Sequence, residues 1–248
     1  MRSNNNILIA QGGGPTNVIN QSLIGIIQEE KKNKSKIFGS INGVNGIINN
    51  NFKLLNKISL PTLKLIGNSP GAALGSTRDK PDQKYCLEIL DILKRKNISK
   101  FYYIGGNDSS DSLKIISNQT KIFKHKLQCI HIPKTIDNDL VCNDHTPGFG
   151  SAAKYVAQLF SGINYDVKSL PGVYLGIIMG RHAGFLTASS SLLKKENDDG
   201  PNLIYIPESP FEINTFLNQI KSVFNKYGRC VVAISDGIQD KNKKLISQ

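Results

Sequence analysis

The sequence of 248 residues contains no run of about 18 apolar residues, the length a helix needs to cross a bilayer. It is also poor in cysteine, and none of its four cysteines has the CxxC spacing typical of metal or redox sites. These shortages exclude a membrane-spanning helix and argue against a disulfide framework or a cysteine metal centre. We therefore expect a cytoplasmic protein with reduced thiols and no membrane partner.

Acidic residues are also scarce, with 19 Asp and Glu against 31 Lys and Arg, which gives a net charge of +12. A basic chain can bind nucleic acid, but no regular pattern of aromatic residues interleaves with these lysines to stack bases. A positive field equally suits small anionic substrates. We favour a small anionic ligand and expect no nucleic-acid partner.

Short apolar runs alternate with helical patterns along the chain. Strands are predicted at 7–10, 101–104, 127–132, 172–179, 203–206 and 230–234. Helices are predicted at 16–30, 81–97, 108–117, 150–164, 182–195 and 211–227, and the asparagine-rich stretch 42–51 is predicted to be a loop or hairpin. This order predicts parallel strands joined by helical crossovers, an α/β fold in α/β/α layers.

Polar or glycine-rich segments follow four of these strands, at Gly12–Thr16, Gly105–Ser110, Pro133–Asp139 and Gly180–Gly184. Ligands of parallel α/β folds bind beyond the carboxyl ends of the strands, so we expect the four loops to face one crevice. Glycines before a helix let a phosphate approach the backbone. Asp108 and Ser109 have the alternative role of capping the helix that follows them. Arg181 can pair with a phosphate through two hydrogen bonds, or can form an ordinary salt bridge.

The strongest candidate is Pro133–Asp139, which brings Lys134, Thr135, Asp137 and Asp139 into one loop after a buried strand. A carboxylate there can accept the proton of an attacking hydroxyl. A lysine beside it can hold a phosphate and stabilise the charge of a leaving group. Carboxylates can also recruit Mg²⁺, which bridges phosphate oxygens. The alternative is a charged surface turn.

Seven segments together resemble the phosphofructokinases, specifically the pyrophosphate-dependent type. They are GGGPTN (12–17), SPGAALGSTR (69–78), GGNDSSDS (105–112), PKTIDND (133–139), TPGFGSA (146–152), MGRHAGF (179–185) and IPE (206–208). The resemblance implies Mg²⁺-dependent phosphoryl transfer from pyrophosphate to the 1-hydroxyl of fructose 6-phosphate, by a homo-oligomer if the chain is full-length. An ATP-dependent 6-phosphofructokinase and a truncated, non-catalytic protein that binds phosphate or sugar phosphate are the alternatives.

The resemblance also implies roles for single residues. Asp137 matches the catalytic base, and Lys134 and Arg181 match residues that assist it. Substrate-binding positions are Thr135, Asp139, Met179, Gly180 and Glu208, and donor-binding positions are Gly13, Arg78, Asp108 and Ser109. Asn107 stands where many relatives carry a Mg²⁺-binding aspartate, so Asp108 is expected to take over part of that role. ATP-using relatives have glycine at the positions of Asp108 and Lys134, so these two side chains indicate pyrophosphate rather than ATP.

Two lobes follow from the resemblance. We expect residues 1–140 to form the donor-binding lobe and residues 141–248 the lobe that binds the sugar phosphate. Relatives continue well beyond the segment Ile234–Gly237, so the second lobe is expected to be incomplete.

Overall fold

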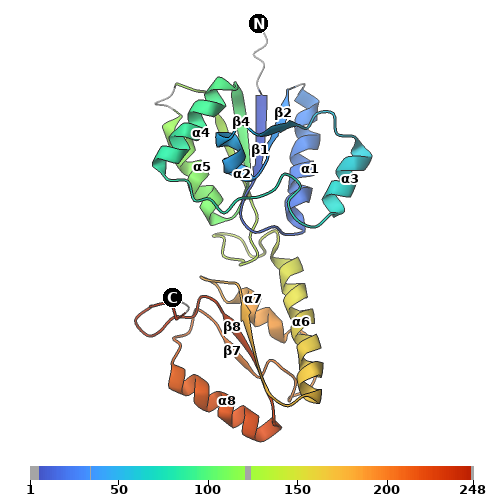
Figure 1. The fold of residues 1–248 in the computed structure, drawn as a ribbon, viewed down its shortest axis with the longest axis vertical. Helices are drawn as coiled ribbons and strands as arrows, with labels where there is room; N and C mark the ends of the chain where they lie inside the picture. Colours follow the sequence, from blue (N-terminus) through green and yellow to red (C-terminus); the bar gives the residue numbers. More distant parts are fainter. Residues whose placement is uncertain (1–5, 34, 121–123, 247–248) are drawn as a thin grey trace. The chain divides into compact units, whose positions relative to one another are not determined.

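The structure, a computed structural model, describes residues 6–33, 35–120 and 124–246. The chain divides into two compact units, Met1–Thr135 and Ile136–Gln248, which we call unit 1 and unit 2 (Figure 1). The division falls shortly before the boundary expected at residue 140. Among the described residues, no helix is both long enough and apolar enough to cross a membrane.

Unit 1 is built on a five-stranded sheet in the order β3-β2-β1-β4-β5. Its strands are β1 (Asn6–Gln11), β2 (Ile37–Ser40), β3 (Phe52–Leu54), β4 (Ile98–Gly105) and β5 (Gln128–Pro133). Its helices are α1 (Val18–Glu30), α2 (Gly43–Ile48), α3 (Leu60–Asn68), α4 (Gln83–Arg95) and α5 (Asn107–Gln119), with a 3₁₀ turn, η1, at Lys31–Asn33. Neighbouring strands pair in parallel except β2 and β3, which are antiparallel.

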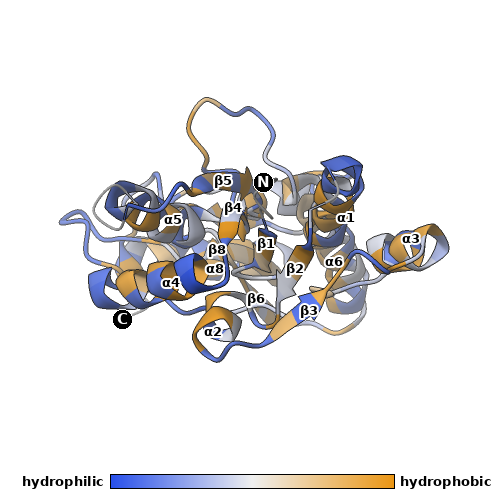
Figure 2. Cartoon of the chain, turned by 90° about the horizontal axis from the view of Figure 1, so that it is seen from above, coloured by the Kyte–Doolittle hydropathy of each residue, from blue (hydrophilic) through white to orange (hydrophobic). Residues whose placement is uncertain are grey.

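Both faces of this sheet are covered by helices. Leu8 and Phe101 pack on one face against apolar residues of α2, α4 and α5, whereas Ile7 and Ile9 pack on the other face against α1 and α3. Successive strand residues point to opposite faces, so the two apolar runs along β1 and β4 fill both layers. Figure 2 shows that α1 and α4 each carry hydrophobic and hydrophilic stretches, as expected for helices with one buried side. The predicted α/β class with α/β/α layers is confirmed in this unit.

Unit 2 contains a three-stranded parallel sheet in the order β6-β8-β7. Its elements are α6 (Phe149–Ser169), β6 (Val173–Ile178), α7 (Phe185–Ala188), the 3₁₀ turn η2 (Ser189–Ser191), β7 (Leu203–Tyr205), α8 (Ile213–Tyr227) and β8 (Cys230–Ser235). The central strand β8 is buried along its whole length. Val231 and Ala233 pack with α6 and α7, and Val232 and Ile234 pack on the opposite face with Phe216 of α8.

The helix predicted at 182–195 is wrong. Its place is taken by the four-residue helix α7 and the 3₁₀ turn η2. The hydroxyls of Ser189, Ser190 and Ser191 each donate a hydrogen bond to the carbonyl three residues earlier. Such local bonds compete with the α-helical pattern, and here they accompany the tightening of the chain into a 3₁₀ turn.

The loop or hairpin predicted at 42–51 is also wrong, because most of this stretch is the helix α2. Val44 and Ile47 are fully buried on the face that carries α4 and α5. Asn42 and Asn50 flank the helix with φ values of 62° and 50°. Asparagine enters this left-handed region more readily than most residues, so the asparagines bound the helix rather than prevent it.

Candidate functional site

Three of the four predicted loops begin at one edge of the unit 1 sheet. β1, β4 and β5 are parallel neighbours, and Gln11 is aligned with Ile104 just as Gly105 is aligned with Pro133. The three strands therefore end side by side, and their loops begin at the carboxyl edge of the sheet, where parallel α/β folds bind their ligands. The fourth loop, Gly180–Gly184, follows β6 in unit 2, and the prediction that all four loops face one crevice stays a prediction.

The glycine loop after β1 requires glycine for two reasons. A Cβ atom at Gly12 would lie 2.7 Å from both the Ser109 hydroxyl and the Tyr103 hydroxyl, closer than real Cβ atoms approach. Gly13 has a φ of +73°, which side chains rarely adopt. The loop thus packs closely on Ser109 at the start of α5 and on Tyr103 of β4.

Lys134 joins two of these loops. Its side chain is buried, and its Nζ donates a hydrogen bond to the carbonyl oxygen of Gly14 at 2.7 Å. Its backbone N–H donates to the carbonyl of Gly105 at 2.9 Å. A buried ammonium group is costly unless it is hydrogen-bonded, so this position is held by specific contacts. The lysine places a positive charge against the glycine loop, and the alternative of a charged surface turn is wrong for this residue.

Arg78 lies beside the same glycine loop. The N–H of Gly13 donates to the carbonyl of Thr77 at 2.9 Å, and the Ser76 hydroxyl donates to the carbonyl of Gly13 at 2.5 Å. Arg78 follows directly and is exposed. The structure therefore brings the predicted donor-binding residues Gly13 and Arg78 together with Lys134.

Asp108 and Ser109 lie in the first turn of α5, whose N-cap residue is Gly106. The alternative in which these two side chains only cap the helix is therefore wrong. Ser109 is buried, whereas Asp108 is exposed and forms a salt bridge with Lys80 at 3.1 Å. Sequence reasoning missed Lys80, although its position two residues after Arg78 was an available signal.

His131 contributes to the support of the site. Its Nε2 lies 3.0 Å from the carbonyl oxygen of Gly105, at the end of β4. Burial lowers the pKa of this histidine, with a smaller opposing effect of the Gly105 carbonyl. The lowered pKa favours the neutral ring, which packs at the sheet edge beside Gly105.

Asp137 and Asp139 begin unit 2 on either side of Asn138. Asn138 is buried with a φ of 58°, and its side chain closes a loop in two places. Its Oδ1 accepts the N–H of Thr146 at 2.8 Å, and its Nδ2 donates to the carbonyl of Asp144 at 3.2 Å. Asn138 thus fixes the backbone between the two predicted carboxylates. Its signal in the sequence was the tolerance of asparagine for left-handed backbone.

The loop after β6 is held by two carboxylates. The N–H of Gly180 donates to Oδ1 of Asp236 at 3.0 Å, and the N–H of Gly184 donates to Oε1 of Glu208 at 2.7 Å. Arg181, between these two anchors, is exposed, as is Met179 at the end of the strand. Unit 2 therefore brings Gly180, Arg181 and Glu208 together, and Asp236 is a positioning residue that sequence reasoning missed.

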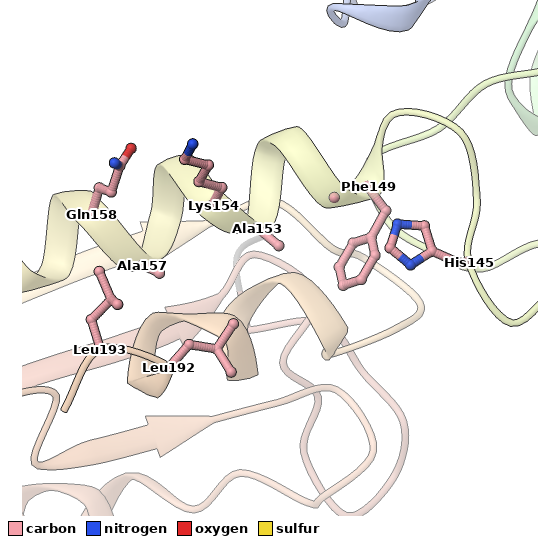
Figure 3. A pocket seen from close by; sticks show the side chains of 9 residues that line it. His145, Phe149, Ala153, Lys154, Ala157, Gln158, Leu192 and Leu193 are labelled. Carbon is pink, nitrogen blue, oxygen red and sulfur yellow. The ribbon is translucent and has the colours of Figure 1, made fainter. Parts of the chain in front are cut away.

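A separate cavity in unit 2 lies along α6 (Figure 3). It has a volume of about 460 Å³. Its lining residues are His145, Phe149, Gly150, Ala153, Lys154, Ala157, Gln158, Leu192 and Leu193. Figure 3 shows Leu192 and Leu193 opposite α6, with Phe149 and His145 beside each other at one end. The predicted site residues do not belong to this lining.

Within the part of the chain that the structure describes, no group of three or more His, Cys, Asp or Glu side chains is arranged to hold a metal ion. Asn107 and Asp108 are both exposed at the start of α5. A metal bound there would take one protein carboxylate, and its other ligands would be water or substrate oxygens.

Comparison with known proteins identifies the family. Residues 6–248 match the family Phosphofructokinase. The pyrophosphate–fructose 6-phosphate 1-phosphotransferases of Rhodospirillum rubrum and Xanthomonas campestris are 55% and 37% identical to the chain and match 94% and 99% of it. The crystal structure of a pyrophosphate-dependent phosphofructokinase from Marinobacter aquaeolei is similar over 96% of the chain, with a TM-score of 0.83 and 33% identity. The chain spans 58%, 61% and 62% of the lengths of these three proteins, respectively.

Proposed function

The chain belongs to the phosphofructokinase family, and we propose that it transfers a phosphoryl group from pyrophosphate to the 1-hydroxyl of fructose 6-phosphate. The observation that carries this proposal is the buried Lys134 ammonium group, 2.7 Å from the carbonyl of Gly14 in the glycine loop. A fixed positive charge at that place would stabilise the charge on the phosphate that leaves pyrophosphate. The high identity to relatives named as pyrophosphate-dependent enzymes supports the same donor.

Unit 1 would bind the donor. The N–H groups of the first turn of α5 can surround a phosphate, which also benefits from the helix dipole, whereas the N–H groups of Gly12 and Gly13 are held by the carbonyls of Ile104 and Thr77. Gly13, Arg78 and Ser109 would contact it, Arg78 through paired hydrogen bonds. The carboxylate of Asp108 would repel and obstruct the additional phosphate and ribose of ATP, so it would act in donor selection.

Mg²⁺ suits this donor site. The exposed carboxylate of Asp108 offers one hard oxygen ligand, and Mg²⁺ in phosphoryl-transfer sites is usually held by one or two carboxylates together with substrate phosphates and water. Asn107 can add an amide oxygen. When bound, the ion would neutralise charge on the phosphate oxygens.

The acceptor sugar would use the segment that begins unit 2 and the loop after β6. Asp137 would accept the proton of the sugar 1-hydroxyl, with Thr135 and Asp139 holding the reactants in line. Met179, Gly180 and Arg181 would bind fructose 6-phosphate, and Glu208 would bind sugar hydroxyls. The anchoring of Gly180 by Asp236 and of Gly184 by Glu208 supports a preorganised loop. We further propose a cytoplasmic homo-oligomer as the working form.

Calorimetric titration of the purified chain with pyrophosphate, ATP and fructose 6-phosphate, each with Mg²⁺, tests the proposal. We expect pyrophosphate to bind more tightly than ATP and fructose 6-phosphate to bind as well. Tighter binding of ATP would favour the ATP-dependent alternative. Binding of pyrophosphate and sugar phosphate without product formation would favour the non-catalytic alternative.

A further inference from the structure

We infer that two buried amide side chains, Gln11 and Asn20, position the irregular loop that presents Arg78 to the phosphoryl donor. The loop comprises residues 69–82 and connects α3 to α4. The donor's identity rests on the proposed function, whereas the contacts that hold the loop all lie within unit 1. Gln11 and Asn20 are positioning residues, because they act through the loop and the glycine turn.

Gln11 is the last residue of β1 and directly precedes the glycine loop. It is fully buried. Its Oε1 accepts the N–H of Leu74 at 2.9 Å, while its Nε2 donates to the carbonyl of Ile19 at 3.1 Å and to Oδ1 of Asn20 at 3.2 Å. One side chain therefore ties the loop to the end of the central strand and to the first turn of α1.

Asn20 holds the same loop at two further points. It is 1% exposed, and its Oδ1 accepts the N–H of Ala73 at 2.9 Å as well as the Gln11 amide. Its Nδ2 donates to the carbonyl of Ser69 at 3.2 Å. The two amides thus fix the backbone at residues 69, 73 and 74, which lie 49 to 63 residues away in sequence.

The fixed part of the loop leads directly to the donor residues. Two residues after Leu74, Ser76 donates to the carbonyl of Gly13, and the carbonyl of Thr77 accepts the N–H of Gly13. Arg78 is the next residue. A loop of this length is ordinarily mobile, and ordering it costs conformational entropy. The hydrogen bonds of the buried amides offset that cost. They also fix the position of Arg78 relative to Gly13.

Glu30 provides a matched control on the same helix. It is buried to the same degree as Asn20 and makes a similar number of hydrogen bonds, to Lys100, Tyr102 and Asn33. It lies at the carboxyl end of α1, whereas Asn20 lies near the amino end, beside the loop. Replacing Glu30 therefore costs stability without releasing residues 69–78.

The experiment compares Asn20→Ala, Ser76→Ala and Glu30→Ala with the unmodified full chain. Hydrogen–deuterium exchange of peptides covering 69–82 reports the order of the loop, and calorimetry with Mg²⁺ and pyrophosphate reports donor affinity. We expect Asn20→Ala to speed exchange in 69–82 and to weaken pyrophosphate binding on the order of tenfold. Ser76→Ala, which removes one partly exposed hydroxyl, should act in the same direction more weakly. Glu30→Ala should lower the midpoint of thermal unfolding but leave both readouts unchanged.

Unchanged exchange and affinity in Asn20→Ala would overturn the inference, as would equal losses in Glu30→Ala. If Asn20→Ala does not fold, Asn20→Asp, which keeps the acceptor oxygen for Ala73 and Gln11 but removes the amide donor to Ser69, decides by the same two readouts. Failure of the unmodified chain to bind pyrophosphate would contradict the proposed function instead. In that case the exchange measurement still decides whether the two amides hold the loop.

Discussion

The ammonium nitrogen of Lys134 donates a hydrogen bond to the carbonyl oxygen of Gly14 at 2.7 Å, although the two residues are 120 positions apart in the chain. We expect Lys134→Met to lower kcat/KM for pyrophosphate about 100-fold, because the apolar stem stays while the charge that we propose to stabilise the leaving phosphate is lost. Steady-state kinetics with varied pyrophosphate measures this. Lys32→Met, which removes an exposed lysine paired with Glu29, is the control and should leave kcat/KM unchanged. Equal values for both variants would contradict the role of Lys134.

The second prediction concerns Asp108 and the choice between pyrophosphate and ATP as donor. Asp108→Gly should reduce the ratio of kcat/KM for pyrophosphate to that for ATP on the order of tenfold, because it removes a negative charge and bulk that oppose ATP. The lost salt bridge with Lys80 is exposed, so the free energy of unfolding should change by no more than about 1 kcal/mol from that source. Asp111→Gly, about one turn later on α5, should leave the ratio unaltered. An unchanged ratio in Asp108→Gly would remove Asp108 from donor selection.

The third prediction concerns the contribution of Asn138 to stability. Asn138→Ala should lower the free energy of unfolding by about 2–4 kcal/mol, because it leaves the buried N–H of Thr146 without its acceptor and forces alanine into left-handed backbone. Asn138→Gly removes the same hydrogen bonds but relieves the strain, so it should be more stable than the alanine variant by about 1 kcal/mol. Urea unfolding measures both. Variants as stable as the unmodified chain would show that the loop is not closed by this side chain.

The environment of Asp199 leads us to predict that the stability of unit 2 falls in acid. Its carboxylate is buried and accepts hydrogen bonds from Lys168 at 2.6 Å, from the N–H groups of Glu196 and Lys195, and from Asn164. The Lys168 ammonium group, followed by these N–H groups, lowers the pKa of Asp199 far below its usual range. The folded state thus holds the proton less tightly than the unfolded state does.

This contribution to stability is fully present above the unfolded pKa of about 3.9 and is lost as the pH falls below it. We expect the midpoint of thermal unfolding, followed by circular dichroism, to fall steeply below about pH 4 and less steeply in Asp199→Asn. Asp91→Asn, which alters an exposed ion pair on α4, should keep the steep profile. Identical profiles for the unmodified chain and Asp199→Asn would contradict the assignment.

The sequence predicted β1, β4 and β5 of the unit 1 sheet and the loops after them because the relevant signals are local, whereas β2 and β3 were not predicted. The apolar runs at Ile7–Ala10 and Phe101–Ile104 are rich in β-branched or aromatic residues, which favours strands. The polar segments that follow these runs can be recognised from the sequence alone. Lys134 was predicted as a site residue for the same reason. Its burial and its bond to Gly14 were not predictable from pattern, because they depend on how β1 and β5 are ordered in the sheet.

The errors have physical causes. The apolar periodicity of 182–195 predicted a helix, but Ser189–Ser191 turn their hydroxyls back to the backbone and tighten the chain. The stretch 42–51 resembled a loop because of its asparagines and glycines, yet tertiary burial of Val44 and Ile47 makes it helical. Gln11, Asn20 and Asp236 were missed because each acts on a backbone group at least 49 residues away.

Phosphoryl transfer itself is observed most directly by ³¹P NMR of the purified chain with fructose 6-phosphate, Mg²⁺ and either pyrophosphate or ATP. We predict that the pyrophosphate resonance declines while orthophosphate and a new 1-phosphate resonance of the sugar rise together, and that Asp137→Asn abolishes this change while pyrophosphate still binds. A new sugar 1-phosphate with ATP and none with pyrophosphate would contradict the proposed donor. Conversion by Asp137→Asn at the rate of the unmodified chain would contradict the proposed base.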